Sequence, residues 1–202
     1  MRKNDPKVIA NLINCLSALE NNTSLLYKAL VDRIELPLVK SLIHTLVQDS
    51  QKHSTILKSI SETLSKKSEK PRDCEKNIGE AWRNVDNLHK EIAGREKLTE
   101  QELSQLLEKL AILESIIGEE YYIFVQLKTL TLMVNEIKQI YAIDLGSLKG
   151  IFGGIINDEE RHREILETVK GMLESKQKAS NPPPLVRYQH PDSWATPMPP
   201  TS

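Results

Sequence analysis

Apolar residues recur at helical spacing along almost the whole chain, and the polar–apolar alternation typical of strands is absent. This pattern predicts an all-α protein. The 202 residues are enough for one domain of ordinary size with a proper hydrophobic core. Four long helices are expected, beginning near Pro6, Pro37, Thr99 and Leu148 and ending near Ile34, Lys67, Lys138 and Lys176.

Turn and capping residues set the boundaries of these helices. Pro37 marks a tight turn before the second helix. Thr99 and Glu102 have the spacing of a capping box, which opens the third. Between the second and third long helices, the sequence predicts a shorter helix over residues 74–93, with Asp73 as its candidate cap. We interpret this shorter helix as an insert between the second and third long helices.

The C-terminal segment, residues 179–202, differs in composition from the rest of the chain. It holds seven of the ten prolines, which rules out a continuous helix. We therefore expect a helical bundle over residues 1–178, followed by a Pro-rich extended or disordered tail. The alternative for the tail is a strap that docks Tyr188 or Trp194 onto a neighbouring subunit.

The charge distribution does not indicate a macromolecular partner. The net charge is −1, and the 27 basic and 28 acidic residues are interspersed rather than segregated. We therefore expect neither nucleic acid nor a membrane surface as a partner. The apolar runs are too short to span a bilayer, and the N-terminus does not resemble a signal peptide, so the expected location is cytoplasmic.

The chain has two cysteines, Cys15 and Cys74, which are far apart and form no CxxC pair. In a reducing compartment such cysteines are more often free thiols than a bridge or a zinc site. We expect both to be free and to pack as small hydrophobic side chains.

Acidic and histidine residues interrupt the apolar faces of the predicted helices. In the last long helix, two polar residues fall within the apolar stripe Ile155, Glu159, His162, Leu166, Val169 and Leu173. The other three helices repeat the feature with Glu20, with His53, and with Glu114 or Glu120. Burying such groups costs several kcal/mol unless something binds them.

One such residue alone is more often a paired core residue than a ligand. Four helices that each bring an acid or a histidine to the packed face favour a metal site. Divalent transition metals suit this set, because the ions neutralise the carboxylates and replace the lost water.

The segment "DEERHREIL" resembles the Glu-x-x-His helix of the ferritin-like and rubrerythrin-like four-helix bundles. Glu20 is followed seven residues later by Tyr27, and Glu114 by Tyr121, which is similar to the Glu-plus-Tyr helix of rubrerythrin-like proteins. The resemblance spans nearly all of residues 5–176. It implies a ferritin-like four-helix bundle with an additional helix inserted between its second and third helices.

The resemblance also implies a set of metal ligands, with two tyrosines, Tyr27 and Tyr121, as hydrogen-bond donors beside them. The sequence departs from the family pattern at Ser50, where Glu is expected three residues before the histidine. Asp49 could reach the same space, since residues four apart share a helix face. Glu120 is the alternative on the third helix. The implied ligands are Glu20, His53, Glu114, Glu159 and His162.

Two functions follow from these residues. The first is a di-iron or di-manganese site performing redox chemistry on iron, dioxygen or peroxide, as a peroxidase or ferroxidase. The sequence has no CxxC pairs of the rubredoxin type, so a peroxidase would need an external electron donor. Because Ser50 replaces an expected carboxylate, the site could hold one metal ion, an asymmetric pair of ions or no metal. The second function is a metal-free adaptor or assembly module. The resemblance also implies a homo-oligomer, with a dimer expected.

Overall fold

The computed structural model describes residues 6–67, 70–126 and 145–180, and within these ranges it contains helices and no strand. The all-α prediction is confirmed for this part of the chain. The helices are α1 (Pro6–Val31), α2 (Pro37–Ser65), α3 (Cys74–Ile78), α4 (Glu80–Ala93), α5 (Glu100–Gln126) and α7 (Leu145–Ser180).

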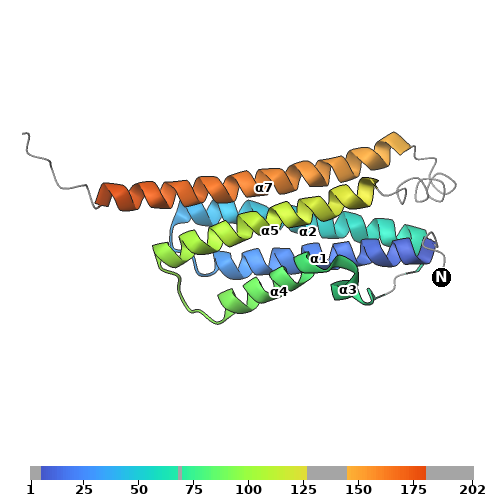
Figure 1. Ribbon diagram of the computed structural model, residues 1–202, viewed down its shortest axis with the longest axis horizontal. Helices are drawn as coiled ribbons and strands as arrows, with labels where there is room; N and C mark the ends of the chain where they lie inside the picture. The colour runs from blue at the N-terminus through green and yellow to red at the C-terminus, as the bar shows by residue number, and fades with distance from the viewer. Residues whose placement is uncertain (1–5, 68–69, 127–144, 181–202) are drawn as a thin grey trace, which may run out of the picture.

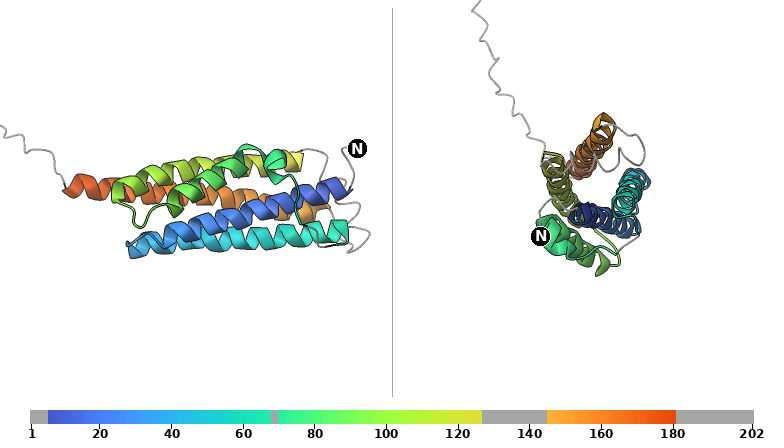
Figure 2. Two further views of the ribbon diagram at one scale, coloured as in Figure 1. Left: turned by 90° about the horizontal axis from the view of Figure 1, so that it is seen from below. Right: turned by 90° about the vertical axis from the view of Figure 1, so that its right-hand side faces the viewer.

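The four long helices lie side by side in an elongated arrangement (Figure 1). α1 packs along α2, and α5 packs along α7. The two pairs meet where α2 contacts α7. The short α3 and α4 lie against the outside of α1, with α4 also reaching α5 (Figure 2). This arrangement directs the inner faces of the four long helices at one another.

Small hydroxyl side chains hold α1 close to α2. Ser17 donates to the carbonyl oxygen of Ser54 at 2.8 Å, and Ser54 donates to that of Ser17 at 2.9 Å. Ser61 donates to the Ala10 carbonyl oxygen at 2.8 Å. Because backbone of the neighbouring helix satisfies each hydroxyl, these buried serines cost little and let the two helices approach closely.

The insert is two helices rather than the single helix predicted over residues 74–93. Gly79, with φ of 71°, separates α3 from α4. Glycine reaches this conformation without the steric cost that a Cβ would add. Asp73 also differs from the prediction, because its backbone is left-handed and its side chain makes no capping hydrogen bond.

The prediction of free cysteines is wrong, because Cys15 and Cys74 form a disulfide. Their Cα atoms lie 5.1 Å apart, within the normal range for a bridge. A sequence separation of 59 leaves no local signal for the pairing. The return of the insert onto α1 brings the two residues together, and both are buried there as expected.

The predicted boundaries hold to within a few residues where the structure describes them. α1 ends at Val31 and α2 at Ser65, slightly earlier than expected. The capping box is confirmed, since the Thr99 amide donates to Glu102 at 2.9 Å and the Glu102 amide donates to Thr99 at 3.2 Å. α7 runs from Leu145 to Ser180, so residues 179 and 180, which the sequence predicts to belong to the tail, are helical. The end expected near Lys138 and tail residues 181–202 lie outside the described residues.

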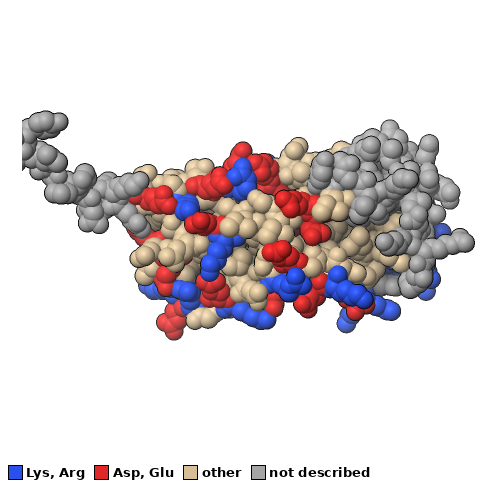
Figure 3. All heavy atoms as spheres, viewed as in Figure 1, with Lys and Arg blue, Asp and Glu red and all other residues tan. Residues whose placement is uncertain are grey.

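Acidic and basic side chains are interspersed over the face of the molecule that Figure 3 shows. None of the helices in the described part of the chain has an apolar stretch of the length that a membrane crossing requires.

Candidate metal centre

Five buried residues meet between the α1–α2 pair and the α5–α7 pair. They are the five predicted from the sequence: Glu20 on α1, His53 on α2, Glu114 on α5, and Glu159 and His162 on α7. None of them is more than 2% exposed. Four helices therefore direct carboxylates and imidazoles into one buried region of the core.

These residues form two groups of potential ligands that share Glu159. Glu20, His53 and Glu159 make the first group, and Glu114, Glu159 and His162 make the second. Within each group, one ligand atom from every residue lies within 4.8 Å of the others. The geometry therefore offers two adjacent positions for a cation, with Glu159 belonging to both.

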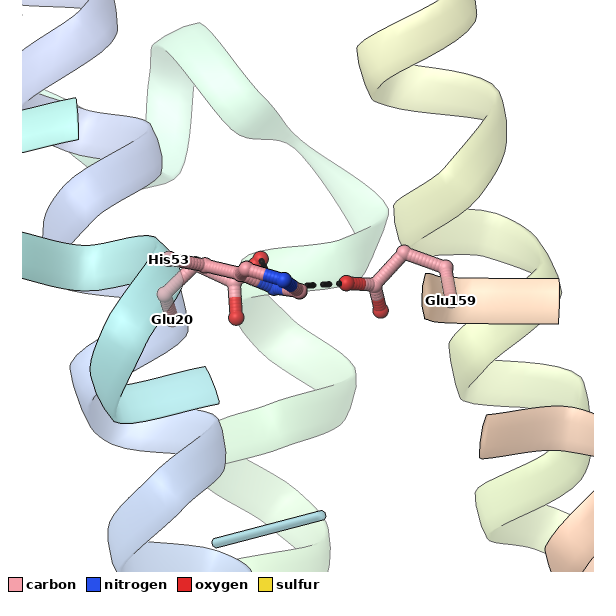
Figure 4. A group of neighbouring side chains, drawn as sticks. All are labelled: Glu20, His53 and Glu159. Atoms are coloured by element: carbon pink, nitrogen blue, oxygen red, sulfur yellow. Dashed lines mark ion pairs between the residues drawn. The ribbon is translucent and has the colours of Figure 1, made fainter. Parts of the chain in front are cut away.

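In the first group, the ligand atoms form ion pairs but no hydrogen bonds. His53 Nδ1 lies 3.1 Å from Glu159 Oε1 and 3.8 Å from Glu20 Oε1 (Figure 4). His53 Nδ1, Glu159 Oε1 and Glu20 Oε2 nevertheless have no hydrogen-bond partner, because closeness alone does not supply the alignment that a hydrogen bond needs. Buried polar atoms without partners are costly, and each needs an explanation.

Asp158 orients the ring of His53. Its Oδ2 lies 2.9 Å from His53 Nε2, and a neutral ring donates its proton in that bond. The lone pair of Nδ1 then faces the carboxylates of Glu20 and Glu159. A lone pair that faces carboxylate oxygens repels them, so this position calls for a cation, either a proton or a metal ion.

The second group is more completely paired within the protein. His162 Nδ1 lies 3.4 Å from Glu114 Oε2 and 3.7 Å from Glu159 Oε2. Tyr27 donates to the other oxygen of Glu114. On the far side of the ring, His162 Nε2 lies 3.4 Å from Asp49 Oδ2. Both oxygens of Glu114 and both ring nitrogens of His162 therefore have partners.

Two buried tyrosines brace the carboxylates across the bundle. Tyr121 on α5 donates to Glu20 Oε1 at 2.5 Å, while Tyr27 on α1 donates to Glu114. Burial, together with the neighbouring carboxylates, raises the pKa of both phenols well above the ordinary value. Both therefore stay protonated and remain donors to the carboxylates they contact.

Four charged residues cover the outer edge of the two histidines. Lys52 Nζ lies 2.8 Å from Asp49 and 2.9 Å from Asp158, and Arg161 lies 2.7 Å and 3.1 Å from the same two carboxylates. Burial raises the pKa of Asp49, but Lys52 and His162 outweigh it and lower the pKa to about 2. The two aspartates therefore stay charged and are balanced by the two cations.

Protons are held tightly inside the centre. Burial raises the pKa of the Glu114 carboxyl, as does the charge of Glu159, and His162 only partly offsets them, giving a pKa of about 8. Burial lowers the pKa of His53, but its contacts with Glu159 and Glu20 outweigh burial and raise the pKa to about 10. Burial also lowers the pKa of His162, but its contacts with Glu114 and Glu159 outweigh burial and raise the pKa to about 11.

The two alternative ligands lie outside both groups. Glu120 is partly exposed, and burial and Glu119 raise its pKa. Asp49 contacts the outer nitrogen of His162 instead of taking the place expected of a carboxylate at Ser50. Ser50 itself is buried on α2.

Sequence reasoning missed Asp158 and the cationic residue before each histidine. The signal is a repeated pattern, Asp-x-x-Lys-His at residues 49–53 and Asp-x-x-Arg-His at residues 158–162. Each copy places its aspartate four residues before its histidine, and in the structure each aspartate contacts the histidine of the other copy.

No protein-family model, no curated protein and no solved structure matches the chain.

Proposed function

We propose that this chain is a ferritin-like metalloprotein whose buried carboxylate and histidine residues bind divalent transition metal ions. The observation that carries the proposal is the set of three buried ligand atoms, on Glu20, His53 and Glu159, that have no hydrogen-bond partner. A bound ion would take the lone pairs of all three at once. It would also neutralise carboxylates whose ion pairs, within the described residues, are with histidines alone.

The donor set supports iron or manganese. Carboxylate and imidazole ligands suit these ions, whereas a site rich in cysteine would favour zinc or an iron–sulfur cluster. Glu and His ligands from facing helices are also how ferritin-like bundles hold two metal ions. The four long helices and the insert are consistent with that architecture.

When bound, iron or manganese would supply one-electron redox chemistry on iron, dioxygen or peroxide. The residues of the chain would position the ions and manage protons. Tyr27 and Tyr121 would hold protons at the ligand carboxylates, and Asp49 and Asp158 would fix the ring orientation of the histidines. Reduction of peroxide would take electrons from an external donor. Assembly as a dimer stays a prediction.

A second candidate is a metal-free helical adaptor or assembly module. Ser50 favours it, because the family pattern has a carboxylate there. The complete pairing of Glu114 and His162 with protein groups also favours it, since those residues are satisfied without an ion. In that function the polar residues would serve only to specify the packing of the bundle.

Metal content separates the two functions. We would express the protein in medium supplemented with iron and manganese and measure bound metal by mass spectrometry. The variant Glu159→Ala/His162→Ala tests the centre, and Glu160→Ala is the matched control because its exposed side chain pairs with Arg163 outside it. Near-stoichiometric metal in the wild type and the control, lost in the double variant, is the expected result.

A folded wild-type protein that holds no metal, and whose melting temperature does not rise when iron or manganese is added, would instead establish the adaptor. With metal present, peroxide consumption and ferrous oxidation are the two activities to measure next.

A further inference from the structure

We propose that the two metal positions are unequal: the first ion binds between Glu20, His53 and Glu159, and the position beside Glu114 and His162 binds a second ion more weakly. This order of loading rests on the proposed metal binding. It predicts that a form with one ion can be isolated.

The first position can accept an ion without losing a hydrogen bond. Each of its three residues contributes an atom without a hydrogen-bond partner, and none of the three is more than 2% exposed. Glu20 keeps Oε2 unpaired while Oε1 accepts from Tyr121. Asp158 holds the His53 ring at Nε2. The Nδ1 atom of His53 points toward Glu20 and Glu159 (Figure 4). An ion entering here leaves the bonds to Tyr121 and Asp158 in place.

The second position is occupied by internal contacts. Glu114 uses Oε1 to accept from Tyr27 and Oε2 to contact His162 Nδ1. An ion bound by both Glu114 and His162 has to replace the contact between them. At the first position an ion displaces the ion pair between His53 Nδ1 and Glu159 Oε1, which is not a hydrogen bond. The additional cost of a lost hydrogen bond therefore falls on the second position.

Charge adds a second reason for the inequality. The two groups contain three carboxylates, on Glu20, Glu114 and Glu159, and Ser50 supplies no fourth. One divalent ion reduces the charge of the ionised set from −3 to −1, whereas a second ion only changes it from −1 to +1, so the first ion alone lowers the magnitude of the net charge. A buried uncompensated charge is unfavourable, so the second ion needs a small anion or binds weakly.

The outer charges do not change this balance. Asp49 and Asp158 are each paired with Lys52 and Arg161, so the four residues together contribute no net charge. The inequality therefore arises within the two ligand groups.

Titration of the metal-free full-length protein with Mn²⁺, without oxygen, tests the order. Calorimetry should show a tight first phase of one equivalent and a second phase at least about tenfold weaker. Electron paramagnetic resonance at one equivalent should show the signal of an isolated Mn²⁺ ion, which weakens through coupling as the second position fills.

Each of the two metal positions contains one histidine, so the same substitution can be made in each position and the two variants compared. His53→Gln should abolish the tight phase, and His162→Gln should retain it at one equivalent. Circular dichroism shows whether each variant is folded. Anomalous diffraction from wild-type crystals grown with one equivalent of Mn²⁺ locates the ion directly and does not depend on any variant.

The outcomes distinguish the order of loading from the function on which it rests. Two equivalents that bind with equal affinity, or a single ion located beside Glu114 and His162, would overturn the order while leaving metal binding intact. Wild-type protein that binds neither Mn²⁺ nor Fe²⁺ would overturn both.

Discussion

The α1–α2 pair and the α5–α7 pair build the same arrangement with one difference. Each pair supplies a glutamate followed seven residues later by a tyrosine, and a histidine preceded four residues earlier by an aspartate. Between that aspartate and histidine, the first pair has Ser50 where the second has Glu159. A nearly symmetrical scaffold therefore concentrates its asymmetry in one side chain.

The two pairs also depend on each other. The tyrosine of each pair donates to the glutamate of the other, and the aspartate of each contacts the histidine of the other. Neither pair alone holds its ligands in position. The centre therefore belongs to the interface between the pairs, and the differences between its halves reflect Ser50 and Glu159.

The largest expected effect comes from removing the shared carboxylate. Glu159→Gln keeps the shape of the side chain but takes its charge from both metal positions. We expect metal affinity to fall by about 100-fold or more, which corresponds to about 2.7 kcal/mol. Metal content after dialysis measures the loss, with Glu160→Gln as the control on the adjacent exposed residue. Metal retained by Glu159→Gln at the level of the control would show that the residue is no ligand.

Making the two pairs alike should have the next largest effect. Ser50→Glu gives α2 the carboxylate that α7 already has, so the second ion should bind about tenfold more tightly. Without metal the additional buried carboxyl should destabilise the protein by about 1–3 kcal/mol. Melting temperatures with and without Mn²⁺ measure both changes.

Gln51→Glu is the control for this variant, since it adds the same charge on the exposed side of α2. An unchanged second phase in Ser50→Glu, in protein that remains folded, would mean that this position does not face the metal centre.

The metal-free protein should lose stability as the pH rises. The folded state raises the pKa of His53 to about 10 and of His162 to about 11 from an ordinary 6.5, and of Glu114 to about 8 from 4.5. The folded chain therefore binds more protons than the unfolded chain. The stabilisation by the histidines is fully present below about pH 6.5 and is lost as the pH rises through 10 to 11. The Glu114 contribution is lost between about pH 4.5 and 8.

Thermal unfolding in a chelator at pH 6 and pH 9 measures this loss. The melting temperature should be lower at pH 9, by about 2–4 °C for each kcal/mol lost. Bound metal replaces the protons, so its affinity should increase over the same range. A melting temperature in chelator that is higher at pH 9 would contradict the assignment of protons to these groups.

The smallest effects should come from the tyrosines, and they separate the two positions. Tyr121→Phe removes the donor to Glu20 and should weaken the first Mn²⁺ phase about threefold to tenfold, in line with about 0.5–1.5 kcal/mol for one hydrogen bond. Tyr27→Phe removes the donor to Glu114 and should change only the second phase. Equal effects of the two variants on both phases would contradict the separate positions.

The helices and the five central residues can be predicted from the sequence because both follow from periodicity. Burial on a helix repeats every three or four residues, so the acids and histidines stand out as interruptions of an apolar face. Periodicity leaves Glu114 and Glu120 as alternatives, and the preference for Glu114 comes from the resemblance to a Glu-plus-Tyr helix, in which Tyr121 follows Glu114 by seven residues. The structure places Glu114 in the centre and leaves Glu120 partly exposed.

Features set by tertiary contacts could not be predicted in this way. The Cys15–Cys74 bridge depends on where the insert returns to the bundle, and no helical period encodes that path. The break at Gly79 depends on a positive φ that a glycine permits but does not require. The partners of the histidines were missed because Asp49 and Asp158 contact the opposite pair of helices.

The bridge between Cys15 and Cys74 also turns the first part of the chain into a covalent ring. The ring contains the rest of α1 after Cys15, all of α2 and the connection to α3. A single proteolytic cut within residues 16–73 would therefore leave both fragments attached to each other. They would separate on a denaturing gel only after a reductant opens the ring.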